Sequence, residues 1–377
     1  MSPKLKKIAR VSFISINLGI IFFYLMACLV PFFDPGKHWF IALLGLGFPL
    51  LFFILAAFLI YWIIRRSKWA FICLAALLLS SQQIAVTFNF WGHKKFEAAK
   101  DPKNLRVLTW NLSSWGESGR TGDINNMDSM LAVIKDINPD VLCFQEYLYL
   151  KRKKYRNAIP PALQECGYRY AYFGQVKYTG YIYSLTVLTA TVIMSKYPII
   201  DSSKTFYHEE GHGEPLVSAD IKINDKTIRI FSTHLQSVSF KENDYEALHN
   251  LKEPVGASVA ETRTLVGKLK IAYKKRGVEA DMLRDKIKES PYPVIVCGDF
   301  NDVPNSYTYF TAKGNLQDAF LKKGWGMGRT FRFISPTLRI DYILADKKFK
   351  VKQYDALQVP YSDHYPVVVD LNINYTN

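Results

Sequence analysis

The sequence predicts a mixed α/β domain with two packed sheets, preceded by a segment that spans a membrane. Two observations carry this prediction. The first quarter of the 377-residue chain contains three long apolar stretches. The rest alternates many short β-branched and aromatic runs with a few helical segments, which favours a two-sheet α+β or α/β sandwich over a doubly wound fold. The composition excludes a disordered chain and a disulfide-stapled miniprotein.

The apolar stretches predict a three-helix transmembrane segment, with spans at about residues 11–33, 39–64 and 69–88. They run for 23, 26 and 20 residues without a charge. A bilayer core about 30 Å thick needs roughly 20 helical residues. The third stretch is weakened by the polar run Ser80–Gln83, and a buried soluble helix is the alternative there. Residues 1–92 are therefore assigned to a membrane anchor.

Basic residues predict the orientation of this anchor. Residues 1–100 hold 11 of the 48 Lys and Arg residues and two of the 33 acidic residues, so they carry +9 of the net charge of +15. The positive-inside rule places the basic groups before the first span and after the second span in the cytoplasm. Three spans then place the C-terminal domain outside it, in a multi-pass protein of the cell (inner) membrane. The alternative is a two-span anchor with a cytoplasmic domain. The basic groups are Lys4, Lys6, Lys7 and Arg10, and Arg65, Arg66 and Lys68.

A linker at residues 93–104 leads to a C-terminal domain at residues 105–377. Its helices are predicted at Met127–Ile137, which ends at Asn138–Pro139, and at Val255–Ile287. Cys143 and Cys297 lie in apolar runs and are expected to be core residues. The predicted strands are Leu105–Asn111, Val141–Gln145, Tyr168–Phe173, Leu185–Met194, Leu216–Ile223, Thr227–Thr233, Tyr292–Cys297, Arg339–Leu344 and Val367–Ile373.

Several common catalytic motifs are absent from the sequence, and one motif that is present is misleading. The sequence has no phosphate-binding P-loop, no dinucleotide fingerprint and no nucleophile elbow. His208–His212 matches the H-E-x-x-H pattern of zinc proteases, which requires a helix. Gly211, Gly213 and Pro215 break the helical periodicity, so we expect a polar loop here.

Polar residues at the ends of the apolar strands are better candidates for a catalytic site. Ionisable groups at core strand ends are costly unless a site uses them. If the strands lie side by side, these residues meet at one rim. Oxygen ligands without thiolates favour Mg²⁺ or Mn²⁺ over zinc, and such a site suits hydrolysis of a phosphate ester. Taken singly, each position has a plainer interpretation as a turn or a helix cap. The set is Asn111, Glu146, His234, Asp299, Asn301, Asp341, Asp363 and His364.

These residues lie in an ordered series of motifs that resembles the endonuclease/exonuclease/phosphatase superfamily. That group contains pancreatic-type deoxyribonucleases, abasic-site endonucleases, neutral sphingomyelinases and inositol-polyphosphate 5-phosphatases. The resemblance covers essentially Leu105–Asn372. It implies a four-layer α/β sandwich and a metal-dependent phosphoester hydrolase. The motifs are WN (110–111), QE (145–146), THLQ (233–236), GDFN (298–301), RIDYIL (339–344) and SDHYPV (362–367).

The resemblance also implies roles for these side chains. Glu146 would be the principal Mg²⁺ ligand, assisted by Asn111 and Asp363. Asp299 would orient or deprotonate the attacking water, and Asn301 would hold the phosphoryl group. His364 would be polarised by Asp341, and His234 would bind the phosphate or assist the leaving oxygen. Whether Asp299 or His364 is the general base stays open.

Three functions follow from the sequence. The first is an anchored phosphodiesterase or phosphatase that acts on lipid headgroups or other small phosphoesters. The second is an anchored nuclease that degrades external nucleic acid, and the third is an inactive binding or scaffold domain. The basic segment Ser237–Ser290 could contact anionic lipid or nucleic acid, but its acidic residues favour a solvated helix face. No protein partner can be deduced.

Overall fold

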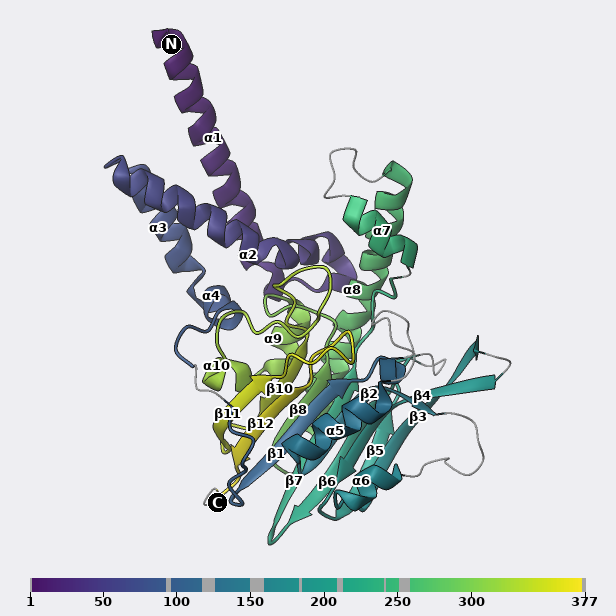
Figure 1. Ribbon diagram of the computed structural model, residues 1–377. Helices are drawn as coiled ribbons and strands as arrows, with labels where there is room; N and C mark the ends of the chain where they lie inside the picture. Colours follow the sequence, from purple (N-terminus) through teal and green to yellow (C-terminus); the bar gives the residue numbers. More distant parts are fainter. Residues whose placement is uncertain are drawn as a thin grey trace.

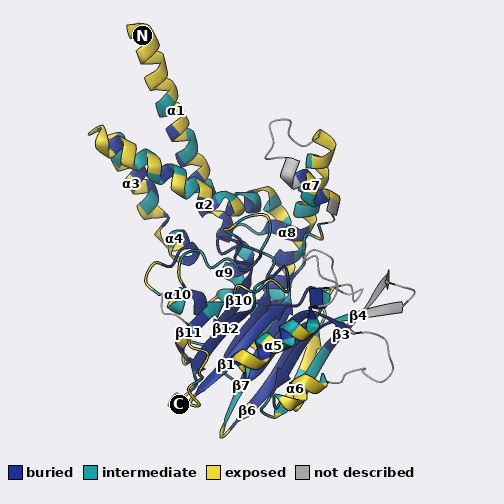
Figure 2. Ribbon diagram, viewed as in Figure 1, coloured by how far each residue is buried: buried dark blue, intermediate teal, exposed yellow. Residues whose placement is uncertain are grey.

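The computed structural model describes residues 2–92, 96–116, 126–149, 159–182, 185–208, 213–240, 242–250 and 258–374. A helical N-terminal segment stands at one end of a domain built from two sheets (Figure 1). Figure 2 shows that the strands of this domain are mostly buried, whereas α1 (Pro3–Cys28) and α3 (Trp69–Leu79) expose much of their surface.

The described strands form two six-stranded mixed sheets. In each sheet two central neighbours, β1 with β2 and β7 with β8, run parallel. The first sheet has the order β11 (Lys350–Ala356), β12 (Val367–Asn372), β1 (Asn104–Asn111), β2 (Val141–Tyr149), β4 (Leu185–Ser195) and β3 (Tyr170–Ile182). The second has the order β5 (Ile199–Thr205), β6 (Leu216–Ile223), β7 (Lys226–His234), β8 (Val294–Asp299), β10 (Asp341–Ala345) and β9 (Gln317–Asp318).

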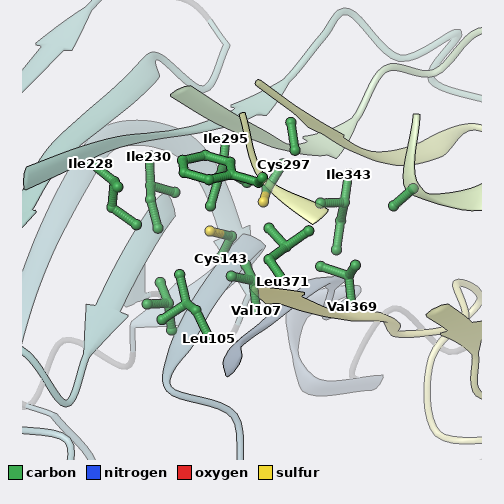
Figure 3. Close-up of a cluster of buried hydrophobic side chains, with 14 of the residues drawn as sticks. Leu105, Val107, Cys143, Ile228, Ile230, Ile295, Cys297, Ile343, Val369 and Leu371 are labelled. Carbon is green, nitrogen blue, oxygen red and sulfur yellow. The ribbon is translucent and has the colours of Figure 1, made fainter. Parts of the chain in front are cut away.

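The two sheets face each other across an apolar core, and helices cover both outer faces. Figure 3 shows Val107 and Cys143 of the first sheet facing Ile295 and Cys297 of the second, so both cysteines are core residues as predicted. On the first sheet lie α5 (Met127–Ile137) and α6 (Pro161–Glu165). On the second lie α8 (Val259–Lys288) and α9 (Tyr307–Lys313). The two-sheet sandwich flanked by helices is therefore confirmed.

Most elements lie where the sequence predicts them, and the misses are short or at sheet edges. Helix α5 and strand β6 have the predicted bounds. Strands β5 and β11 were not predicted, because each lies at a sheet edge: β5 has only exposed and half-buried positions, and β11 mixes exposed polar positions with buried ones. An edge strand lacks the continuous apolar run that marks a central strand. Short helices α7 (Glu242–Asn250) and α10 (Ala319–Lys323) were also missed.

The N-terminal segment contains two helices, not clearly three, that are long and apolar enough to cross a membrane. Helix α1 with the turn that follows it spans Pro3–Phe32, and α2 spans Pro35–Ile64. The third apolar stretch is instead a bent pair, α3 and α4 (Ser81–Thr87), with an angle of 62° between them. An 11-residue helix such as α3 is about 16 Å long, which alone is too short for a bilayer core.

Polar side chains explain the bend between α3 and α4. The Ser80 hydroxyl lies at the bend, donates to the Leu77 carbonyl at 2.9 Å and shares a hydrogen bond with the Tyr24 hydroxyl. Gln83 donates to the Cys28 carbonyl at the end of α1, at 3.0 Å. The polar run that weakened the sequence signal is therefore used to join the third stretch to α1.

Several polar contacts dock the helical segment onto the domain. Asn305, in the loop after β8, donates to the Ala27 carbonyl of α1 at 3.0 Å. Asn89 donates to three carbonyl groups at the end of α10. Arg339 donates to the Val86 carbonyl of α4 at 2.6 Å and pairs with Asp318 at 2.6 Å. The N-terminus and the turn between α2 and α3 lie on the side away from the sheets (Figure 1).

We predict that Arg339→Met will destabilise the protein strongly, because it leaves the Asp318 carboxylate buried without its partner. Breaking a buried ion pair in this way typically costs about 3–5 kcal/mol. Arg284→Met is the matched control, since Arg284 pairs with Asp281 and Asp285 on an exposed helix face and should cost less than about 1 kcal/mol. Urea unfolding of the full chain in detergent micelles measures both. Equal costs for the two variants would contradict the structural role of Arg339.

Candidate active site

Asp299 lies at the centre of the rim where the strands of both sheets end. It is the last residue of β8, and strand register places it beside His234 of β7 and opposite Asp341 of β10. Gly298 brings β8 close to β7: a Cβ at this position would lie 2.0 Å from the Thr233 carbonyl oxygen. The Asp299 carboxylate accepts hydrogen bonds from the Asn301 backbone N–H at 2.7 Å and from the Asn111 side-chain amide at 3.1 Å.

A β-bulge directs Glu146 into the same site. The register between β2 and β4 shifts between Phe144 and Tyr147, and Glu146 has a positive φ of 50°. A bulge removes a residue from regular pairing and re-aims its side chain. The Glu146 carboxylate accepts from the Asn111 amide at 3.1 Å. The same amide therefore connects Glu146 of the site to Asp299.

Each of the two imidazoles is held by a carboxylate at Nδ1, which turns Nε2 toward Asp299. His364 Nδ1 lies 2.9 Å from Asp341 Oδ2, and His364 Nε2 lies 3.7 Å from Asp299 Oδ2. His234 Nδ1 lies 3.2 Å from Glu214 Oε2, and His234 Nε2 lies 3.7 Å from Asp299 Oδ2. The two rings thus approach one carboxylate oxygen from two different elements.

The structure brings all eight sequence-predicted site residues together. Asn111, Glu146, His234, Asp341 and His364 contact one another or Asp299 as described above. Asp363 Oδ1 lies 4.0 Å from His364 Nε2. The Asn301 side-chain amide donates to the Leu235 carbonyl at 2.9 Å. Asn301 lines the same cavity as Glu146, His234, Asp299, Asp363 and His364.

The charged groups of this site shift one another's pKa values. Burial, and then the charge of Asp341, raises the pKa of Asp299 to about 6. Burial disfavours the charged form of His234, but the hydrogen bond and charge of Glu214 outweigh it and raise its pKa to about 10. For His364, burial is likewise outweighed by Asp341 and Asp299, so its pKa lies well above the usual range. Both imidazoles are thus stabilised in the protonated form by neighbouring carboxylates.

The donor set fits a divalent cation. One ligand atom each from Asp299, Asp341 and His364 lie within 4.8 Å of one another, and all three residues are buried. Glu146 and Asp363 add carboxylates whose charges repel each other. Such crowding of acids is relieved by a bound cation, and oxygen-rich sets of this kind suit Mg²⁺ or Mn²⁺.

Two residues of the site were not found from the sequence. Glu214 holds His234 and accepts hydrogen bonds from the Glu146 backbone N–H at 3.1 Å and from Thr191. It lies between Gly213 and Pro215 and does not follow an apolar run, so no strand-end signal marks it. Arg276 was assigned to a solvated helix face, which is wrong: it is 1% exposed, stacks on Tyr273 and donates to the Asn301 carbonyl. The charge pattern of α8 does not distinguish this buried arginine from its exposed neighbours.

His208, the first residue of the zinc-protease-like pattern, lies outside the site. Its Nε2 is 2.8 Å from Glu279 Oε1 of α8, and it is in a loop as predicted. Residues 209–212, which include the second histidine of the pattern, lie outside the described residues. Among the described residues, the one group of acids and histidine close enough to hold a cation is Asp299, Asp341 and His364. Because His364 is held by Asp341 in its protonated form, the cation ligands expected from the sequence are instead the neighbouring oxygens of Glu146, Asn111 and Asp363.

Two family models match the chain. The model of the Endonuclease/Exonuclease/phosphatase family matches residues 86–364. The model of a Domain of unknown function (DUF8431) matches residues 9–87. No match was found among curated proteins.

Solved structures similar to this chain include three from different organisms. An endonuclease/exonuclease/phosphatase from Beutenbergia cavernae is 21% identical, with 71% of each chain covered and a TM-score of 0.48. The human Nocturnin catalytic domain is 19% identical, with 74% of this chain and 100% of that chain covered and a TM-score of 0.48. The mannosyl-6-phosphatase of Bacteroides thetaiotaomicron is 18% identical, with 71% and 99% covered and a TM-score of 0.46.

We predict that His364→Ala will lower phosphoester turnover on the order of 10²-fold or more, because it removes a charged donor beside Asp299. His208→Ala is the matched control. It removes the same side chain from a loop contact with Glu279 and should change turnover by less than about tenfold. Steady-state rates with a nitrophenyl phosphodiester, in the presence of Mg²⁺, compare the two. A larger loss in His208→Ala would mean that the site lies elsewhere.

Proposed function

Because the chain belongs to the endonuclease/exonuclease/phosphatase family, whose members hydrolyse phosphoesters, we propose that it is a membrane-anchored, Mg²⁺- or Mn²⁺-dependent hydrolase of this kind. The observation that carries the proposal is the convergence of five carboxylates and two imidazoles, each imidazole held by one of these carboxylates, on one rim. An inactive scaffold would have no need to keep these costly buried charges together.

The proposed roles follow the contacts of each side chain. Glu146, Asn111 and Asp363 would hold the cation, which when bound offsets negative charge on the phosphoryl oxygens. Asp299 is fixed by two hydrogen bonds and would accept a proton from the attacking water. His364, held by Asp341, and His234, held by Glu214, would donate hydrogen bonds to the phosphoryl and leaving oxygens. Asn301 would position the phosphoryl group.

The reaction is a hydrolysis. Water attacks the phosphorus atom, the bond between phosphorus and the leaving oxygen breaks, and the proton lost by the water is returned to that oxygen. The side chains above supply the proton acceptor and the hydrogen-bond donors for this step, and no further reactant is required.

The proposed anchor comprises residues 1–92, followed by a linker at residues 93–104 and the catalytic domain at residues 105–377. We propose that α1 and α2 each span the membrane and that the bent pair α3–α4 returns to the side of the domain. Two features support this: the Ala27 end of α1 and the Val86 end of α4 both contact the domain. The N-terminus and the turn between α2 and α3, near which the basic groups occur in the sequence, lie away from the sheets (Figure 1).

This arrangement favours a catalytic domain outside the cytoplasm. The N-terminal basic residues and Arg65–Lys68 lie away from the sheets, and the positive-inside rule assigns them to the cytoplasm. The domain then lies on the opposite side. The two-span alternative would place the domain and the N-terminus on one side.

We predict that removal of divalent ions with excess EDTA will abolish turnover and that added Mg²⁺ or Mn²⁺ will restore it. Glu146→Gln should lose most of the metal affinity, because it removes a carboxylate ligand. Asp299→Asn should keep most of that affinity but lower kcat on the order of 10²-fold, because it removes the proton acceptor. Calorimetric Mn²⁺ titration and rate measurements separate the two effects. Equal loss of metal binding in both variants would show that the roles are misassigned, and full activity in EDTA would contradict metal dependence.

A second prediction concerns topology. An alkaline phosphatase reporter, which folds only outside the cytoplasm, should be active when fused after Asn377 and inactive when fused within Arg65–Lys68. A green fluorescent protein fusion at each position provides the complementary readout. The reverse pattern at both positions would place the catalytic domain in the cytoplasm.

A further inference from the structure

The lining of the cavity at the candidate site combines two chemically different sets of side chains. The cavity has a volume of about 210 Å³. One set, Glu146, His234, Asp299 and His364, belongs to the polar site. The other set is apolar and comes from several elements, including Leu46, Phe240, Leu269, Val303, Phe331 and Ile334. A small polar phosphoester would use only the first of these sets.

Part of the apolar lining belongs to none of the three main cores. Val303, Phe331, Leu338 and Ile340 form a separate buried cluster with Phe333, apart from the three cores that pack the sheets and their helices. All four of the cluster's buried members line the cavity. An apolar lining beside a few polar groups is the usual composition of a binding site for a partly apolar ligand.

The anchor contributes directly to this wall. Leu46 belongs to α2, a helix apolar enough to span a membrane, and it lines the cavity while remaining 37% exposed. Its neighbour Gly45 lets α2 approach the loop after β8: a Cβ on Gly45 would lie 2.4 Å from the Asn305 carbonyl oxygen. The Asn305 side chain in turn donates to the Ala27 carbonyl of α1. Asn305 therefore contacts both α2, at Gly45, and α1, at Ala27, and these contacts hold Leu46 beside the site.

We propose that the substrate is a membrane lipid phosphoester. Its phosphate would bind beside Asp299, and the first part of its apolar tail would lie against Leu46. This inference rests on the proposed hydrolase function and on α2 spanning the membrane. The cavity is smaller than the roughly 300–1,000 Å³ of typical small-molecule sites. It therefore accommodates a headgroup and the beginning of a tail, and the rest of the tail extends along α2 into the bilayer.

A series of esters with one reacting group and different tails tests this inference. The full chain, in dodecyl maltoside micelles at constant detergent concentration with Mg²⁺, is given methyl, butyl and octyl p-nitrophenyl phosphodiesters. We expect kcat/KM to rise with tail length, by up to about fourfold for each methylene that becomes buried. In Leu46→Ser the ratio of octyl to methyl kcat/KM should fall at least about tenfold. Leu46→Trp places a larger side chain in the cavity wall and leaves less room for a tail, so the preferred ester should shift from octyl to butyl.

Leu50→Ser is the matched control, because Leu50 lies one turn further along α2, is 65% exposed and does not line the cavity. It should keep the wild-type octyl-to-methyl ratio, which excludes a general effect of a polar residue in α2 or of ester partition into micelles. An equal ratio in the wild type and both Leu46 variants would overturn the lipid inference. Hydrolysis of plasmid DNA without any tail-length preference would overturn it in favour of a nuclease. Failure of the wild type to hydrolyse any ester or DNA with Mg²⁺ or Mn²⁺ would instead overturn the proposed function.

Discussion

The burial of several carboxylates beside Asp299 is the constraint on which the rest of the site depends. Asp299 and Asp341 are each about 1–2% exposed, and burial together with the charge of Asp341 raises the pKa of Asp299. Such groups are stable only when hydrogen-bond donors or cations surround them. The Asn111 amide, the Asn301 backbone N–H and the two imidazoles supply these donors. Each donor comes from a different strand end or loop, so the site exists only when both sheets are paired correctly.

The same constraint explains why the site lies at the rim between the sheets. Gln145, next to Glu146, donates to Ser232 of β7 at 3.1 Å and thereby joins the first sheet to the second. Ser362 donates to the Asn111 carbonyl, and the Trp110 indole donates to the His364 carbonyl. These bonds tie the loop that carries Asp363 and His364 to the end of β1. Backbone carbonyl groups at the end of β1 and in this loop thus accept hydrogen bonds that help to position the candidate catalytic residues.

The sequence was sufficient to predict the two-sheet fold, and the eight polar residues that it singles out lie together at one rim, because central strands and the polar residues that follow them both produce local signals. A central strand is a continuous apolar run, and a polar residue directly after it is conspicuous. Glu214 and Arg276 gave no such signal, since their roles come from tertiary contacts with His234 and with the Asn301 carbonyl. The break at Ser80 was visible only as a weakened apolar run. Its geometry depends on contacts with Tyr24 and Leu77 that no local pattern specifies.

The helical segment is docked onto the domain and is not merely tethered to it by a linker. A flexible linker would raise the local concentration of substrate but leave the site open on every side. Here α2 lies directly beside the loop that follows β8, and the contacts of Asn305, Asn89 and Arg339 hold the helices against the domain. The strand ends that carry the polar site therefore face the helical segment. With α2 in a membrane, one wall of the cavity would be continuous with the bilayer, and a lipid would reach Asp299 without passing through bulk water.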